Sequence, residues 1–197
     1  MIRYSLGILR HYLPLGTVLI TLAAGAAAAA LYRRFAPDAL ASRRRARLLG
    51  ILVSYLLMSF TVLVFARTRK TGELLNFQLF WSYRAIARGN RTFFYQVVLN
   101  VLLFVPIGYL WQALDRKPAF WRTLGLGTGI SLLAELLQLF LHRGLFELDD
   151  LVHNVLGTAL GALLCLAAEK LRRQGKMQEL PPSEQEVKHE QNEGKAE

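Results

Sequence analysis

ELLQLFLHRGLFELDDLVHNVLGTALG, residues 135–161, joins two apolar segments across a short polar break. Glu135 lies within the first apolar segment. Arg143 marks the break, and Asp149 and Asp150 come just before the second segment. A charged side chain inside a membrane-spanning helix costs about 3 kcal/mol on insertion scales, so it usually faces a protein interior or a water-filled cavity. The stretch therefore predicts two membrane helices that meet at a polar site.

The rest of the chain is also typical of a membrane protein. Hydrophobic residues make up 53% of its 197 residues, and the mean hydropathy is +0.29. A spanning helix needs roughly 17–25 mostly apolar residues, whereas a spanning strand needs only about 9–11 of alternating polarity. Five segments have the helical length: residues 13–32, 48–66, 92–114, 119–141 and 151–168. We expect an all-α, multi-pass protein of the cell membrane, a bundle of about five transmembrane helices.

The charges of the chain predict its orientation. Lys and Arg are enriched in short cytoplasmic loops. Thirteen Lys and Arg residues lie in or beside the connection after the first segment, in or beside the connection after the third, or shortly after the fifth segment, and these positions share one side of the membrane. Nine lie on the other side. We therefore expect the N-terminus outside and the C-terminus inside. No basic soluble domain is left to bind nucleic acid, so the expected partner of the cations is the lipid bilayer.

The second connection, residues 67–91, departs from this pattern because it contains six cations. Its middle, residues 74–83, is apolar and aromatic but too short to cross a membrane. We expect an interfacial segment between helices two and three. The favoured interpretation is a lipid-anchoring segment whose cations contact phosphates nonspecifically. The alternative is a basic lid that covers the polar site and binds an anionic substrate.

Polar residues from three segments are expected to meet in the outer half of the membrane. At 1.5 Å per residue, Glu135 lies about 20 Å along the fourth segment from its inner end, and Asn100 about 12 Å from the outer end of the third. Residues expected to bind a substrate are Asn100, Glu135, Gln138, Arg143, Asp150 and Asn154. Because buried charges need partners, we expect Arg143 to pair with one of the two adjacent aspartates. Glu135 is expected to bond to the Asn100 or Asn154 amide.

These positions resemble the VanZ-like family. The resemblance covers residues 48–168 and rests on the order of several short motifs. They are Asn100 with Pro106 and Gly108, Glu135 with Gln138, Arg143 with Gly144, Asp149 and Asp150 with Asn154 and Gly157, and Gly161. The resemblance implies a small multi-helix protein of the bacterial plasma membrane. The member for which the family is named lowers susceptibility to teicoplanin, and the family supplies no catalytic assignment. The repeat of Gly157 and Gly161 also predicts close packing of the last helix.

Three functions fit these residues. The favoured one is binding or modulation of a cell-envelope component at the outer leaflet, such as a lipid-linked precursor or a glycopeptide-related ligand, with a contribution to glycopeptide resistance. The second is a purely structural polar network that locks the helices together. The third is an intramembrane hydrolase of a lipid-linked or phosphate-bearing substrate, in which Glu135 is the general base and Arg143 stabilises an anion. Asp149 and Asp150 are further catalytic candidates.

A metal-dependent version of the enzyme would use the aspartates with His142 or His153. No ligand motif such as H-E-x-x-H is present, so neither a metal nor another cofactor is expected. The predicted organisation has three parts. Residues 1–47 form the first transmembrane helix and a basic cytoplasmic loop, residues 48–170 form the VanZ-like membrane domain, and residues 171–197 form a disordered acidic tail.

Overall fold

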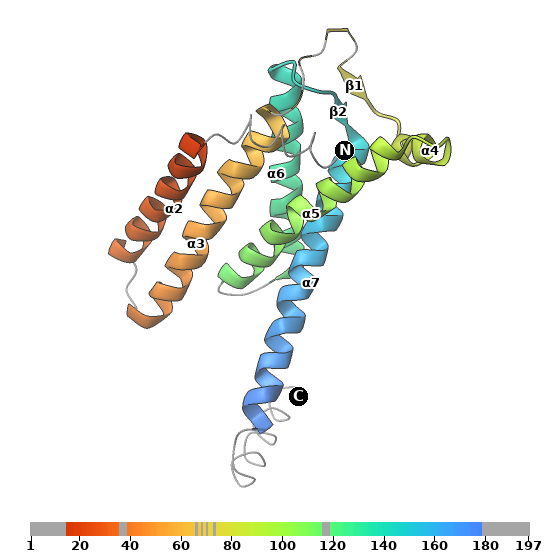
Figure 1. The fold of residues 1–197 in the computed structure, drawn as a ribbon. Helices are drawn as coiled ribbons and strands as arrows, with labels where there is room; N and C mark the ends of the chain where they lie inside the picture. The colour runs from red at the N-terminus through yellow and green to blue at the C-terminus, as the bar shows by residue number, and fades with distance from the viewer. Residues whose placement is uncertain are drawn as a thin grey trace.

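The computed structural model describes residues 15–35, 39–65, 67, 69, 71–72, 74–115 and 119–178. Within these ranges, five helices are long and apolar enough to cross a membrane. They are α2 (Leu15–Phe35), α3 (Ala39–Phe60), α5 (Arg91–Leu114), α6 (Phe120–Phe140) and α7 (Leu148–Gln178) (Figure 1). The turn η1 (Thr61–Phe65) continues α3 with π-helical hydrogen bonding. The expected five-helix membrane protein is confirmed.

The connection between α3 and α5 contains the short helix α4 (Trp81–Ala87) and the short strand β1 (Leu75–Asn76). β1 pairs in parallel with β2 (Phe146–Glu147), which lies between α6 and α7. The backbone N–H of Phe146 also donates to the Leu74 carbonyl at 2.8 Å. Two connections that are about seventy residues apart in the chain are therefore held together at one end of the bundle.

Two of the expected boundaries were wrong. α3 begins at Ala39, so the four arginines between residues 43 and 47 lie on a helix and not in a loop. α7 runs to Gln178, so helix extends into the predicted tail, whose remaining residues 179–197 lie outside the described ranges. In both cases helix formation continues past the apolar stretch, because Arg, Lys, Gln and Ala are good helix formers in water as well.

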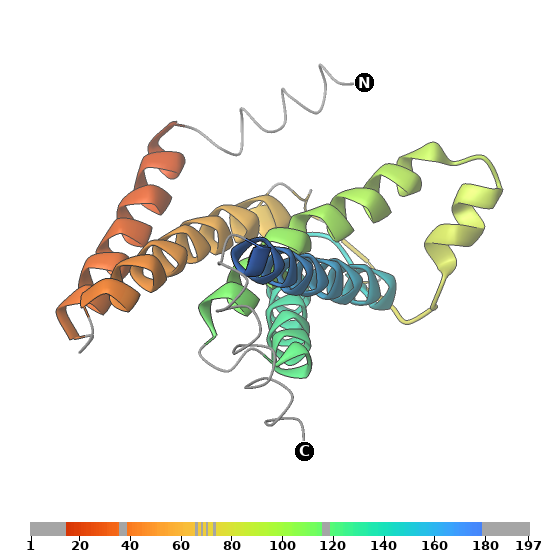
Figure 2. The ribbon, with the colours of Figure 1, turned by 90° about the horizontal axis from the view of Figure 1, so that it is seen from below.

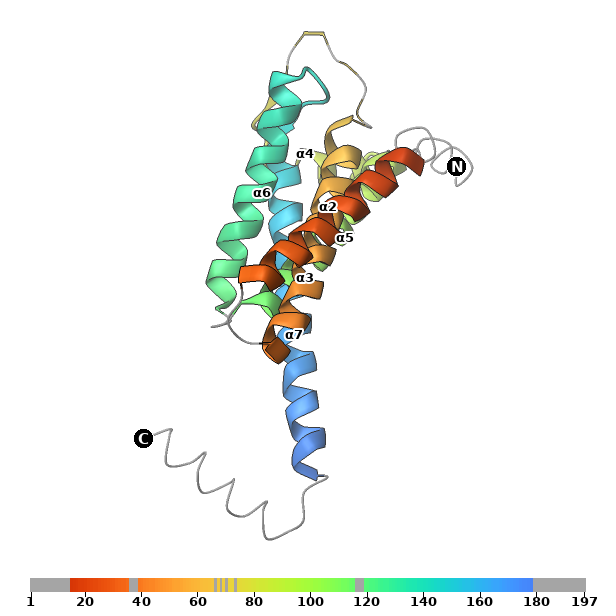
Figure 3. The ribbon, with the colours of Figure 1, turned by 90° about the vertical axis from the view of Figure 1, so that its left-hand side faces the viewer.

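Close glycine contacts hold α7 against α5; the sequence predicted close packing of this helix but not its neighbour. A Cβ atom on Gly157 would lie 2.1 Å from the Val101 carbonyl oxygen, and one on Gly161 would lie 2.0 Å from that of Val105. Only glycine permits such an approach of two backbones. Figures 2 and 3 show α2 and α3 as a pair at one side of α5, α6 and α7.

The two ends of the bundle differ in character. The ends of α2 and α5 and the starts of α3 and α6 lie at one end, which we call the basic end after Arg33, Arg34, Arg45 and Arg122 (Figure 1). The described residues between 67 and 91, together with residues 141–150, lie at the opposite end, which we call the loop end. The polar residues singled out in α6 and α7 lie toward the loop end.

Candidate functional site at the loop end

Glu135 is buried, with only 1% of its surface exposed. Its Oε2 accepts a hydrogen bond of 3.0 Å from the backbone N–H of Glu147 in β2. The expected bond to Asn100 or Asn154 was wrong, because the α6–α7 connection folds back over the end of α6 and brings a backbone donor to the carboxylate. Asn154 donates instead to Ser131 Oγ at 2.8 Å, one helical turn before Glu135.

One of the two aspartates expected to pair with Arg143 pairs with a different arginine. Arg67 Nη2 lies 2.7 Å from Asp150 Oδ2, and the Asp150 side chain is 4% exposed. Burial lowers the pKa of the Arg67 guanidinium, but the charges of Asp150, Glu135 and Glu147 outweigh it and raise that pKa above its ordinary value. Among the described residues, Arg67 is thus a cation that compensates the buried acids.

The predicted pairing of Arg143 with an aspartate was therefore wrong. Arg143 Nη1 donates to the Phe65 carbonyl at 2.9 Å, and its guanidinium lies 5.5 Å from the centre of the Phe65 ring. That carbonyl belongs to the end of η1, where helix carbonyls lack intrahelical partners. The sequence did contain a signal for Arg67, since it directly follows the second apolar segment at the end where both aspartates lie.

Asp149 fixes the start of α4. Its carboxylate accepts hydrogen bonds from the backbone N–H groups of Phe80 and Ser82, the latter at 3.0 Å, and from Ser82 Oγ at 2.6 Å. This is the role of a helix N-cap, supplied here from another part of the chain. Phe80 has a left-handed backbone with φ of 59°, which a phenylalanine adopts only when its surroundings hold it there. Asp149 therefore fastens α4 to α7.

Several buried polar atoms in this region have no hydrogen-bond partner among the described residues. They are both amide atoms of Gln138, Asn154 Oδ1, Asn100 Nδ2 and His153 Nδ1. Gln138 is fully buried, and a Cβ atom on Gly144 would lie 2.9 Å from its Oε1. Buried polar groups are rarely left without a partner, so such a concentration indicates a strained or functional site.

Charge is arranged in two layers at the loop end. Inside are four carboxylates that are each at most 4% exposed, those of Glu135, Glu147, Asp149 and Asp150. Outside are exposed arginines of the second connection, Arg69, Arg84, Arg88 and Arg91. Within the described part of the chain, no group of three His, Cys, Asp or Glu side chains is placed to hold a metal ion. The interior acids can accept hydrogen bonds and hold cations, and the outer arginines can bind anions.

Residues 48–169, more than half of the chain, match the family model described as VanZ/LLP1. The chain belongs to the VanZ/LLP1 family. No curated protein and no solved structure matches it. The matched region contains every candidate site residue, whereas α2 and the arginines at the start of α3 lie outside it.

In this VanZ/LLP1 protein the second connection is folded onto the polar residues. Arg67 binds Asp150, the start of α4 is held by Asp149, and Tyr83 Oη lies 3.0 Å from His153 Nε2. Gln96 at the start of α5 donates to Glu147 at 3.3 Å. The connection therefore covers the buried cluster as a lid.

Proposed function

We propose that this VanZ/LLP1 protein binds an anionic group of a lipid-linked cell-envelope component at the outer leaflet of the bacterial plasma membrane, and so contributes to glycopeptide resistance. The observation that supports this most is the lid, which presents exposed arginines while its own position is fixed by buried carboxylates. The distribution of Lys and Arg predicts that the loop end lies outside. A phosphate-bearing headgroup would there meet the lid first.

The two layers of charge have separate tasks in this proposal. Arg69, Arg88 and Arg91 contact the anion, since guanidinium groups recognise phosphate through paired hydrogen bonds. Asp149 and Asp150 do not contact it but hold the lid. The unpartnered Gln138 amide, the unpartnered Asn154 Oδ1 and the Glu135 carboxylate beneath the lid form hydrogen bonds with the polar part of the ligand when the lid moves outward.

A polar network that serves only stability is the competing explanation. Buried ion pairs are often no more stabilising than apolar residues of the same size, so a network of four acids is better explained by function than by stability. A hydrolase receives less support. Glu135 already accepts the Glu147 N–H, and Arg143 is engaged with Phe65, so neither is aimed at a common reacting atom.

Binding is tested with the purified full-length protein in mild detergent and a polyprenyl phosphate as the probe. Replacing Arg69, Arg88 and Arg91 together with glutamine should lower the affinity at least tenfold, because the loss of even one charge-assisted contact costs about 1.5–3 kcal/mol. Three matched replacements at the basic end, of Arg33, Arg34 and Arg43, should leave it within about twofold. Equal losses in both variants would mean that only overall charge matters.

The role of the buried charge is tested by Glu135→Gln in bacteria exposed to teicoplanin. Glutamine retains an oxygen that accepts the Glu147 N–H, so we expect a normal amount of protein in the membrane. We also expect protection to be lost, because the negative charge beside Arg67 is gone. Full protection at normal protein levels would favour the structural explanation. A wild-type protein that protects against no envelope-targeting drug would show that the resistance role does not apply to this chain.

A further inference from the structure

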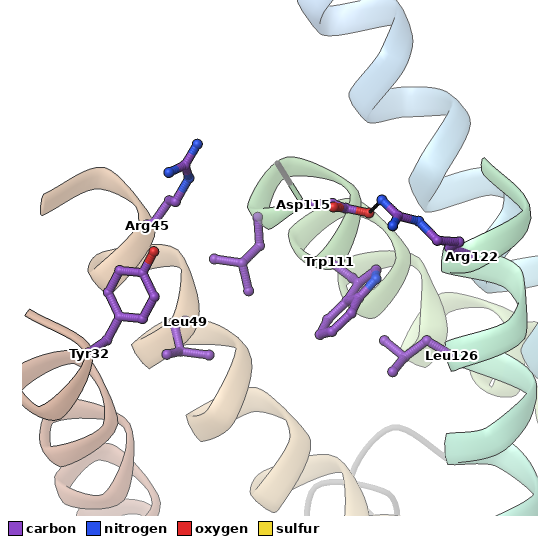
Figure 4. A pocket seen from close by; sticks show the side chains of 8 residues that line it. Tyr32, Arg45, Leu49, Trp111, Asp115, Arg122 and Leu126 are labelled. Carbon is purple, nitrogen blue, oxygen red and sulfur yellow. Dashed lines mark hydrogen bonds and ion pairs between the residues drawn. The ribbon is translucent and has the colours of Figure 1, made fainter. Parts of the chain in front are cut away.

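A cavity of about 480 Å³ opens at the basic end, between the α2–α3 pair and the α5–α6 pair. Tyr32 of α2 and Arg45 of α3 form one wall, and Trp111 of α5 and Arg122 of α6 form the other. Figure 4 shows Arg45, Asp115 and Arg122 along one side of the cavity, and Leu49 and Leu126 on the other. We call this cavity the basic-end pocket.

The described polar side chains that line the basic-end pocket leave one positive charge in excess. Arg122 pairs with Asp115 at 2.6 Å. Arg45 has no ion-pair partner among the residues that the structure describes. The indole N–H of Trp111 is buried and likewise has no hydrogen-bond partner there. The pocket thus has a guanidinium without an ion-pair partner and, in its wall, a buried neutral donor without a partner, beside two leucines.

We propose that the basic-end pocket binds the phosphodiester of an anionic phospholipid from the inner leaflet. Arg45 and the Trp111 N–H donate to the phosphate oxygens, and the upper part of the acyl chains lies against Leu49 and Leu126. Trp and Tyr side chains are enriched where headgroups begin, and basic pockets between helices on the cytoplasmic side bind anionic lipids. This site lies at the opposite end of the bundle from the lid and does not depend on the function proposed for it.

The charge of the pocket selects the class of phosphate. Among the described residues that line the pocket, two arginines and one aspartate give a net charge of +1. A phosphodiester has a single negative charge and matches it, whereas a phosphomonoester has a charge of about −1.5 to −2 at pH 7. Asp115 would repel the second charge. The apolar leucines further favour a lipid over a soluble anion.

Part of this pocket comes from outside the family region. Tyr32 and Arg45 precede residue 48, where the match to the VanZ/LLP1 model begins. The lipid site therefore belongs to the combination of α2 and α3 with the family helices. A bound lipid between the two pairs would join them where they are separated by the cavity.

The test uses the full-length protein in mild detergent, with short-chain phosphatidylglycerol as the probe and native mass spectrometry as the measurement. Arg45→Gln should weaken binding about tenfold, as expected for the loss of a charge-assisted hydrogen bond. Arg34→Gln is the matched control and should change it less than about twofold. Arg34 lies two residues after Tyr32 on another side of α2, and it does not line the pocket.

A second variant covers the case in which Arg45→Gln does not fold. Trp111→Phe keeps the aromatic ring but removes the N–H, and it should weaken phosphatidylglycerol binding about threefold to tenfold. Phosphatidylcholine, which has no net charge, should bind more weakly to the wild type than phosphatidylglycerol. Equal losses in Arg45→Gln and Arg34→Gln would overturn the proposal in favour of diffuse attraction. Displacement of the lipid by millimolar inorganic phosphate would show that the site takes a free anion instead.

Discussion

Replacement of Arg67 by methionine is expected to destabilise the protein more than any other single arginine replacement among the described residues. Methionine retains much of the length and volume of the side chain but removes its charge. Asp150 would then be left 4% exposed without the cation that lies 2.7 Å from it. Glu135 and Glu147 would also lose their favourable electrostatic interaction with the Arg67 guanidinium.

The size of the effect follows from burial. Removing one partner of a buried ion pair costs roughly 3–5 kcal/mol because the other charge stays buried. The Arg67 side chain is 24% exposed, so water can partly replace it, and we expect a loss near the lower limit, about 3 kcal/mol. Adding Asp150→Asn should not add its full single-variant cost. We expect a coupling of about 2 kcal/mol between the two positions, within the range found for residues in contact.

The measurement is the free energy of unfolding in mixed micelles, obtained by titration with sodium dodecyl sulfate. Arg122→Met is the matched control, because Arg122 makes an ion pair of 2.6 Å but its side chain is 57% exposed. Exposed pairs contribute only about 0.2–1 kcal/mol, so this variant should lose less than about 1 kcal/mol. The reasoning is refuted if Arg67→Met loses no more than the control, or if its effect simply adds to that of Asp150→Asn.

Other features allow further predictions. Gly157→Leu should sharply lower the amount of protein in the membrane, since a Cβ atom at this position would meet the backbone of α5. Gly129→Leu should not lower it, because no atom lies within 4 Å of a Cβ atom there. Equal yields of the two variants on immunoblots would contradict this packing. Asp149→Ala should speed amide hydrogen exchange in α4 and lower the free energy of unfolding by about 1–3 kcal/mol, because two backbone N–H groups lose their acceptor. Unchanged exchange would mean that other contacts hold α4. With the native cysteine replaced, single cysteines at Arg34 and Thr71 should react with an impermeant reagent from opposite sides of the membrane, and reaction from one side would overturn the topology.

The structure agrees with the second sequence-based interpretation of residues 67–91 in the position of the lid, over the polar site. The lid was expected either as a lipid anchor or as a basic cover for the polar site. The structure places it over the site, but with its contacts made to acids: Asp149 holds α4 and Asp150 holds Arg67. A count of Lys and Arg in the sequence showed the excess of cations in this connection. The count could not show that Arg67 pairs with a buried acid while the other arginines of the connection remain exposed.

The sequence by itself determined the helices and their shared polar end. Whether about twenty residues can span a bilayer depends on their own apolarity, and the fixed rise of a helix gives the depth of each residue along it. The five spans, the close packing of α7 at its glycines and the burial of Glu135 could therefore be predicted from local composition and spacing. Apolarity does not mark a boundary where a helix continues beyond the apolar stretch. The start of α3 and the end of α7 were therefore missed.

Only the tertiary structure decided which groups pair. Asp150 and Arg67 are 83 residues apart, and Glu135 and Asp149 bind backbone N–H groups, which every residue but proline possesses and which no sequence pattern marks. The choice between Arg67 and Arg143 depends on the path by which each connection crosses the end of the bundle. A buried charge requires a partner, and that requirement is visible in the sequence; the identity of the partner depends on distances of a few ångströms that only the folded chain sets.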